Sequence, residues 1–289
     1  MSVPGVSVQK MTTVALIIDS SACLPARPPV VGVVPVVIHL PDGDVVGDAP
    51  AAVDRVYEAL RRREPVKSSA PSAVEYLAAI EQAPANDVLV ITPAEEFTTM
   101  YRNACVAAEI ASERVAVVDS RTAAAAHGLV VQEAADAASS GSSLEEVTTT
   151  AEDAARRAEL VATLEGLEYI RKSGRVPPAA LGLARHLGVR PVFRLRDGTV
   201  ERLGLPRSPQ SAISRVAHEA EVRGVGQAQR SVLFHAADPE GAAALGALLG
   251  VEDSTEFSPS MGIHTGPGVV GVAWLGPRDR SLGPELSWV

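Results

Sequence analysis

Short runs of β-branched residues alternate with longer, alanine-rich amphipathic stretches through the first half of the chain. The apolar runs predict buried strands at Val14–Ile18, Val33–Ile38, Val88–Ile91 and Val115–Val118. The amphipathic stretches predict helices near residues 51–63, 72–82, 99–112 and 122–139. Continuous apolar strands separated by helices are typical of a parallel sheet covered by helices. The pattern therefore predicts an α/β fold for this half.

The second half has a less regular order of elements, which follows a serine-rich break at 139–143 and a predicted helix from Leu144 to about Ala158. The pattern then predicts, in order, a strand at Leu160–Leu164, a short helix at Leu167–Lys172, a helix near Pro178–Leu187, a hairpin of Val189–Arg194 and Thr199–Leu205 around the turn Asp197–Gly198, helices near 208–223 and 239–249, and strands at Ser231–Phe234 and Val269–Trp274. This order predicts an α+β arrangement with a mixed sheet. We place an N-terminal α/β domain at 13–158, a C-terminal α+β domain at 159–277 and a tail at 278–289.

Composition and charge exclude several classes of function. The chain has a formal net charge of −9 and no basic run interleaved with aromatic residues, so it lacks the features of a nucleic-acid-binding protein. Its apolar runs are much shorter than the ~20 residues that a membrane span needs. Residues 1–13 lack the apolar core of a signal peptide. We therefore predict a soluble, cytoplasmic protein with no nucleic-acid partner and no stable membrane insertion.

The cysteines and histidines show no metal-binding pattern. Cys23 and Cys105 lie far apart, and the six histidines show no His-x-x-x-His spacing. No basic residue flanks either cysteine to lower its pKa. The sequence predicts no metal, no cofactor, no disulfide and two buried, unreactive thiols.

Small polar residues follow three of the predicted parallel strands. They are Asp19–Ser21, Thr92–Pro93 and Asp119–Arg121. Parallel strands bring their carboxyl ends to one edge of the sheet, and ligands bind there. We expect Asp19 and Asp119 to hold amides of neighbouring loops by hydrogen bonds, which leaves ligand contacts to other residues.

A polar turn precedes the last predicted strand. Within Gly262–Gly268, Pro267 and Gly268 suit the central positions of a type II turn, whose second residue needs a positive φ. Such a stiff turn would hold His264 and Thr265 in a ligand-facing loop at the mouth of the strand. A plain turn with a solvated histidine fits the same residues.

Hydroxyl side chains also gather where two helices are predicted to begin. Ser72 stands three residues before Glu75, which predicts a capping box. The capping explanation is weaker for Ser68 and Thr98, so these two are candidates for ligand contacts.

Taken in order along the chain, these segments resemble the motifs of the DegV family of fatty-acid-binding proteins, from Thr13 to Gly276. The matching segments are Asp19–Pro25, the region of Val34–Val36 and Asp48, Ser68–Ser72 for the family's Thr-Ser-Gln-Pro-Ser, Thr98–Tyr101 for Ser-Gly-Thr-Tyr, Asp119–Ser120, Ser173–Arg175 for Gly-Gly-Arg, and the unchanged His264–Gly268. Thr99 replaces a glycine that would let the backbone approach a ligand closely, and the preceding loop 93–96 carries two extra negative charges.

The resemblance implies a long-chain fatty acid bound between two domains, with its carboxylate held by hydroxyls of these loops. The ligand-binding residues implied are Ser68, Ser69, Thr98, Thr99, Arg175, His264 and Thr265. It also implies a non-enzymatic carrier that presents the carboxylate to a partner fatty acid kinase, which makes an acyl phosphate for phospholipid synthesis.

Two other functions use the same residues. A serine hydrolase or acyltransferase would need Ser68 or Ser20, His264, and Asp19 or Asp119, although no Gly-x-Ser-x-Gly elbow is present. A phosphate or sugar-phosphate site in the Thr92–Thr98 segment is disfavoured, because that segment has no glycine and two glutamates.

An arginine-rich segment lies in the second half, between residues 185 and 207. Its members are Arg185, Arg190, Arg194, Arg196, Arg202 and Arg207. It is either a solvated hairpin face or a docking surface for a partner.

Overall fold

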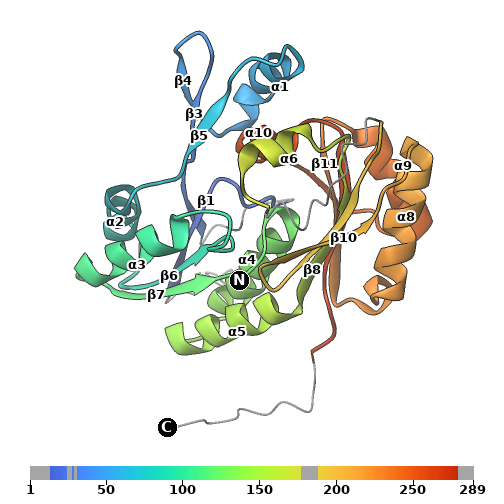
Figure 1. Ribbon diagram of the computed structural model, residues 1–289. Coiled ribbons are helices and arrows are strands. Elements are labelled where there is room, and N and C mark those ends of the chain that lie inside the picture. Colours follow the sequence, from blue (N-terminus) through green and yellow to red (C-terminus); the bar gives the residue numbers. More distant parts are fainter. Residues whose placement is uncertain (1–13, 25–27, 29–30, 177–187, 279–289) are drawn as a thin grey trace, which may run out of the picture.

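The first half of the chain forms a four-stranded parallel sheet in the computed structural model (Figure 1), which describes residues 14–24, 28, 31–176 and 188–278. The strand order is β2-β1-β6-β7, with all neighbours parallel. The strands are β1 (Val14–Asp19), β2 (Val31–Val34), β6 (Asp87–Thr92) and β7 (Arg114–Asp119). The α/β fold predicted for this half is confirmed.

Helices cover both faces of this sheet. They are α2 (Ala73–Glu81), α3 (Met100–Ile110), α4 (Ala124–Ser139) and α5 (Leu144–Arg157), whereas α1 (Val53–Arg61, preceded by the 3-10 turn Pro50–Ala52) lies away from this sheet, beside α10 (Pro259–Thr265; Figure 1). Ile17 and Val90 pack with α2 and α3, whereas Leu16 and Leu89 pack with α4 and α5 on the other face. The predicted capping box is present, because Ser72 accepts from the backbone N–H of Glu75 and the Glu75 side chain accepts from Ser72.

The predicted strand Val33–Ile38 is wrong, because two strands in different sheets occupy its place. After β2, the strand β3 (Val37–His39) joins a small antiparallel sheet of order β4-β3-β5, with β4 (Val45–Gly47) and β5 (Lys67–Ser69). Pro35, which lacks an N–H, separates the two strands, and the Val36 N–H donates to Ser20 Oγ instead of to a strand. The sequence pattern missed both β4 and β5.

The second half forms a six-stranded mixed sheet of order β10-β9-β8-β13-β11-β12, in which only β11 and β12 pair in parallel. The strands are β8 (Ala158–Thr163), β9 (Val192–Arg196), β10 (Thr199–Gly204), β11 (Arg230–Ala236), β12 (Ser254–Glu256) and β13 (Val269–Leu275). The helices are α6 (Glu168–Ser173), α8 (Pro209–Val222), α9 (Pro239–Leu249) and α10 (Pro259–Thr265), with a 3-10 turn at Val225–Gln227. The predicted mixed sheet is confirmed, and the helix predicted near 178–187 lies outside the described residues.

The tip of the β9–β10 hairpin touches the first half of the chain. Asp197 and Gly198 form its two-residue turn, with φ of 49° and 69°. The Gly198 N–H donates to the carbonyl oxygen of Arg121 at 2.7 Å, and the Arg121 side chain pairs with Asp197. The hairpin therefore bridges the two halves on one side.

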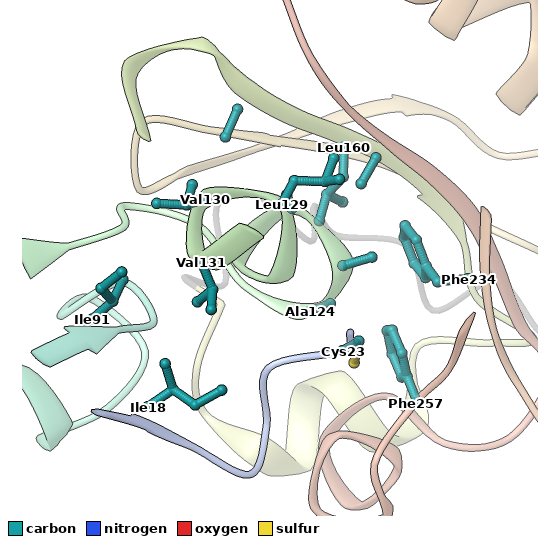
Figure 2. Packing of buried hydrophobic residues seen from close by; sticks show 14 of the residues in the cluster. Ile18, Cys23, Ile91, Ala124, Leu129, Val130, Val131, Leu160, Phe234 and Phe257 are labelled. Carbon is teal, nitrogen blue, oxygen red and sulfur yellow. The ribbon is translucent and has the colours of Figure 1, made fainter. Parts of the chain in front are cut away.

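Helix α4 lies between the two sheets and contacts both. Figure 2 shows Leu129, Val130 and Val131 of this helix between Ile91 of the parallel sheet and Leu160 of the mixed sheet. Most residues of α4 are small, which allows other backbone segments to approach closely. A Cβ added at Gly128 would overlap the carbonyl oxygen of Cys23 and lie 3.0 Å from its carbon.

The two cysteines differ in their surroundings. Both are free, and Cys23 is buried, which raises the pKa of its thiol to about 12. Cys105 is partly exposed, so the prediction of two buried thiols is wrong for Cys105.

We predict that Gly128→Ala lowers the free energy of unfolding by roughly 1–3 kcal/mol, because overpacking at Cys23 outweighs the higher helix propensity of alanine. Chemical denaturation monitored by circular dichroism measures this change. Gly47→Ala is the matched control, since a Cβ there meets nothing within 4 Å. Equal stability of the two variants would show that the contact between α4 and Cys23 is not tight.

Candidate functional site

An apolar cavity of about 190 Å³ lies between the two halves of the molecule. Its walls come from both sheets and from the loops beside them. The apolar lining from the first half is Val36, Ala70, Pro93, Phe97, Met100, Ala123 and Ala124. The apolar lining from the second half is Leu160, Ala162, Leu164, Ile170, Val176, Phe193, Leu195, Val200, Phe234, Phe257, Met261 and Val269. Such a lining suits an alkyl chain more than a polar ligand.

A group of polar side chains interrupts this apolar lining. Ser68 Oγ and His264 Nε2 lie 3.0 Å apart, although Ser68 and His264 are 196 residues apart in sequence. Both line the cavity together with Arg175. The same three side chains line a second hollow of about 460 Å³, so they stand where the two spaces meet. We refer to Ser68, Arg175 and His264 as the polar end of the cavity.

Helix α10 positions His264, which corrects the prediction of a ligand-facing loop. Ser258 is the N-cap residue and Pro259 stands at the first helical position, which is a recognised start signal for a helix. His264 and Thr265 occupy the last turn of this short helix. The Thr265 hydroxyl donates to the carbonyl oxygen of Met261 at 3.0 Å. The helix, more than the turn after it, therefore fixes where the imidazole lies.

Asp48 anchors the beginning of α10, and the sequence pattern did not identify this role. Its carboxylate accepts from the Ser260 N–H at 2.8 Å and from the Ser260 hydroxyl at 2.5 Å. It also accepts from the Ser20 hydroxyl at 2.8 Å. Burial raises the pKa of Asp48. Because Ser20 follows β1, these hydrogen bonds tie the parallel sheet to the helix that carries His264.

The turn after α10 has the positive φ that was predicted for Gly268. Gly268 has a φ of 80°, and its N–H donates to the carbonyl oxygen of Ala236 at 2.7 Å. Gly266 also has a φ of 80°, and a Cβ at that position would lie 2.7 Å from Cε2 of Tyr169. Both positions therefore require glycine.

The polar end combines one cation with neutral hydrogen-bonding groups. Burial lowers the pKa of the half-buried Arg175 guanidinium, which nevertheless remains charged at neutral pH. Its Nη1 donates to the carbonyl oxygen of Ser173 at 3.2 Å, and no carboxylate pairs with it in the described part of the chain. Burial, and to a smaller extent the charge of Arg175, lowers the pKa of His264 to about 3. This arrangement is suited to a single anionic group attached to an apolar chain.

The residues singled out from the sequence do not all reach the cavity. Ser68, Thr98, Arg175, His264 and Thr265 line it, whereas Ser69 and Thr99 are not among the lining residues. The exposed Ser69 hydroxyl lies 2.9 Å from His39 Nε2. Adjacent residues of a strand point to opposite faces, which explains why Ser68 and Ser69 differ.

Thr99 is the N-cap residue of α3, where its side chain makes no capping hydrogen bond. Its hydroxyl oxygen lies 3.5 Å from the Asn103 side-chain nitrogen. The side chain that faces the cavity at this point is therefore the neighbouring Thr98.

The strand-end aspartates hold loop amides, as expected. Asp19 is fully buried and accepts from the Ser21 N–H at 2.8 Å. Asp119 accepts from the Arg121 N–H at 2.8 Å. Neither is within hydrogen-bonding distance of His264, so the described residues contain a Ser68–His264 pair but no acidic third member for a catalytic triad.

Two members of the arginine-rich segment are ion-paired with a buried carboxylate. Arg194 Nε lies 2.6 Å from Glu159, and Arg196 lies 3.6 Å from the same carboxylate, which is 4 % exposed. Arg194 also lines the cavity, which the sequence pattern did not indicate. Arg185 lies outside the described residues.

The part of the chain that the structure describes contains neither a candidate metal site nor a candidate membrane-spanning helix. No three side chains of histidine, cysteine, aspartate or glutamate gather as a metal site would require. None of the helices there combines the length and the apolar character that crossing a bilayer needs.

Comparisons with known proteins identify the fold. A fatty-acid-binding DegV family protein from Thermus thermophilus aligns with a TM-score of 0.82 and 25% identity, covering 92% of this chain and all of that one. The Fatty Acid Kinase B3 protein of Streptococcus pneumoniae, solved with linoleic acid, aligns with a TM-score of 0.80 at 21% identity, covering 92% of this chain and 100% of that chain.

Sequence comparison gives the same answer. A DegV domain-containing protein of Streptomyces coelicolor is 30% identical over 272 residues, which cover 90% of this chain and 97% of that protein. The model of the DegV family, described as a family of uncharacterised proteins, matches residues 13–276. With this match, and with the two sheets and the cavity between them, the chain belongs to the DegV family.

Proposed function

We propose that this protein carries a long-chain fatty acid in the apolar cavity and presents its carboxylate, at the polar end, to a partner fatty acid kinase. The observation that carries the proposal is a half-buried Arg175 without a carboxylate partner at the end of an apolar cavity. The carrier itself is not an enzyme and needs no cofactor. We place it in the cytoplasm, where two free cysteines are stable as thiols.

Simple energetics favour this ligand. Burial of each methylene contributes roughly 0.8 kcal/mol, so a sixteen-carbon chain offers on the order of 12 kcal/mol before ordering costs. Few polar contacts are then needed for tight binding. The positive charge of Arg175 offsets the desolvation of the carboxylate, and the hydrogen-bonded pair of Ser68 and neutral His264 keeps one donor for it.

The related structures support the same proposal. The Thermus thermophilus protein is a fatty-acid-binding protein, and the Streptococcus pneumoniae protein was solved with linoleic acid. The second of these is a protein of a fatty acid kinase, which supports a kinase as the partner here.

A serine hydrolase is the second candidate, because Ser68 and His264 lie within hydrogen-bonding distance. A general base works best when its pKa is near the working pH. The pKa of about 3 makes His264 a poor base, and no aspartate orients its ring among the described residues. Reaction of Ser68 with a fluorophosphonate probe would favour the hydrolase, whereas an inert protein favours the carrier.

We expect the purified protein to hold fatty acid of about fourteen to eighteen carbons, because a hydrophobic ligand of this size dissociates slowly. Mass spectrometry of the extract from denatured protein detects it. The absence of any such acid, together with no binding of added hexadecanoate to the delipidated protein, would refute the carrier function.

Arg175→Gln should weaken hexadecanoate binding by about 10- to 100-fold, because a charge-assisted hydrogen bond contributes roughly 1.5–3 kcal/mol. Displacement of a fluorescent fatty acid measures the change. Arg171→Gln is the matched control, since Arg171 is exposed on helix α6, just before Arg175, and does not line the cavity. Similar affinities for both variants would remove Arg175 from the site.

Fatty-acid affinity should be constant from about pH 6 to about pH 8. The pKa of His264 is lowered from 6.5 to about 3, so its imidazole is already neutral throughout this range. If a cationic His264 were needed, affinity for the anion would instead fall as the pH rises through about 6.5. Titrations of the delipidated protein at several pH values distinguish the two.

A further inference from the structure

Buried polar side chains gather at the carboxyl edge of the parallel sheet. Asp19 ends β1, Thr92 ends β6, and His127 lies in the first turn of α4. All three residues are fully buried. Ile17 of β1 pairs with Val90 of β6, so Asp19 and Thr92 stand side by side two residues further on. His127 reaches the same place, because its Nε2 lies 3.9 Å from Asp19 Oδ2.

Several polar atoms of this group have no hydrogen-bond partner among the described residues. They are Asp19 Oδ2, Thr92 Oγ1 and both ring nitrogens of His127. The hydroxyl of Tyr76, on α2, is also buried and unpartnered. Burial, and to a smaller extent the charge of Asp19, raises the pKa of Tyr76, so Asp19 lies near this hydroxyl. Buried polar groups in folded proteins are nearly always hydrogen-bonded, and several unpartnered ones in one place indicate a ligand that they share.

The geometry of Asp19 leaves one of its two oxygens open to such a ligand. Oδ1 accepts from the Ser21 N–H at 2.8 Å and from the Ser21 hydroxyl. Oδ2 is directed towards His127, but 3.9 Å is too long for a direct hydrogen bond. A single water oxygen at hydrogen-bonding distances of about 2.8–3.0 Å can reach both Oδ2 and Nε2.

The chemistry of the group favours a neutral ligand. Burial raises the pKa of Asp19 and lowers that of His127 to about 3. His127 is therefore uncharged at neutral pH, and its ring offers one donor and one acceptor. The hydroxyls of Thr92 and Tyr76 can each donate or accept. Water has two donors and two acceptor sites and typically bonds to two to four groups when buried, so it matches this mixed set.

We propose that this edge of the parallel sheet is a binding site for buried water, which bridges Asp19 Oδ2, His127 Nε2 and the hydroxyls of Thr92 and Tyr76. The water site is independent of the proposed fatty-acid function. Its effect is to fix Asp19, whose other oxygen holds Ser21, and Ser21 lines the apolar cavity. The water therefore supports one wall of the cavity from behind.

The sign of the change in melting temperature in Thr92→Val tests the site. Valine has nearly the shape of threonine and is more apolar, so replacing an unpartnered hydroxyl would raise the melting temperature. If the hydroxyl binds water, we expect a melting temperature lower by about 2–4 °C, because the water loses a partner. Tyr76→Phe should give a loss of similar size. An unchanged or raised melting temperature in either variant would overturn the site.

Thr163→Val is the matched reference for these measurements on the delipidated full-length protein. Thr163 is also buried, but its hydroxyl lies within 3.5 Å of the backbone carbonyls of Leu164 and Arg190. Losses from Thr92→Val and Thr163→Val should add in the double variant, because the two sites are separate. Losses from Thr92→Val and Tyr76→Phe should not add, because both act on the same water. Additive losses in this second pair would show that the two hydroxyls share no ligand, which contradicts the proposal.

A high-resolution crystal structure identifies the occupant directly. We expect an ordered water oxygen within about 3.2 Å of both Asp19 Oδ2 and His127 Nε2, enclosed by protein. A direct hydrogen bond between Asp19 and His127, with no electron density beside them, would exclude the bridging water. A melting temperature that rises with added Na⁺ or K⁺ at constant ionic strength would show that a cation binds here instead, and the proposal would then fail.

Discussion

The small side chains of helix α4 are the constraint on which the rest of the structure depends. A helix packed between two sheets keeps them apart by its own diameter, and alanine and glycine keep that separation small. Gly128 allows the segment after β1 to pass directly against the helix. The loops at the carboxyl ends of the parallel strands are therefore held close to the mixed sheet, and the cavity forms between them.

The site follows from hydrogen bonds that cross between the two halves. Asp48 connects Ser20, next to β1, with Ser260 at the start of α10. This places His264 against Ser68, which comes from the small antiparallel sheet. The result is a neutral imidazole, a hydroxyl and one guanidinium around the same point at one end of the apolar cavity.

Periodicity in the sequence predicted the elements that are long and strongly patterned. The parallel strands β1, β6 and β7, the helices α2 to α5 and the hairpin around Asp197 were found because each carries its own local signal. The strands β4 and β5 were missed, since three residues are too few to show an alternation. Helix α10 was missed although Ser258 and Pro259 mark its start, because the glycine-rich turn after it dominated the interpretation.

The candidate site depended on the resemblance to the family more than on periodicity. The hydrophobic pattern of the sequence did not predict that Ser68 lies beside His264. These residues are far apart in the chain, and the spacing of neighbouring residues carries no information about such a contact. Strand geometry explains why Ser68 and Ser69 differ, but only once β5 is known to exist. The role of Asp48 depends on a contact across 212 residues, and no local feature of the sequence reveals it.

The cavity has a thermodynamic consequence, because its walls belong to both halves of the molecule. A ligand that binds only the folded protein stabilises it by an amount set by its affinity and its free concentration. An alkyl chain lying against both sheets would then act as an exchangeable piece of the hydrophobic core. If the proposed fatty acid is the ligand, its release would remove part of the packed interior and lower the stability of the folded protein.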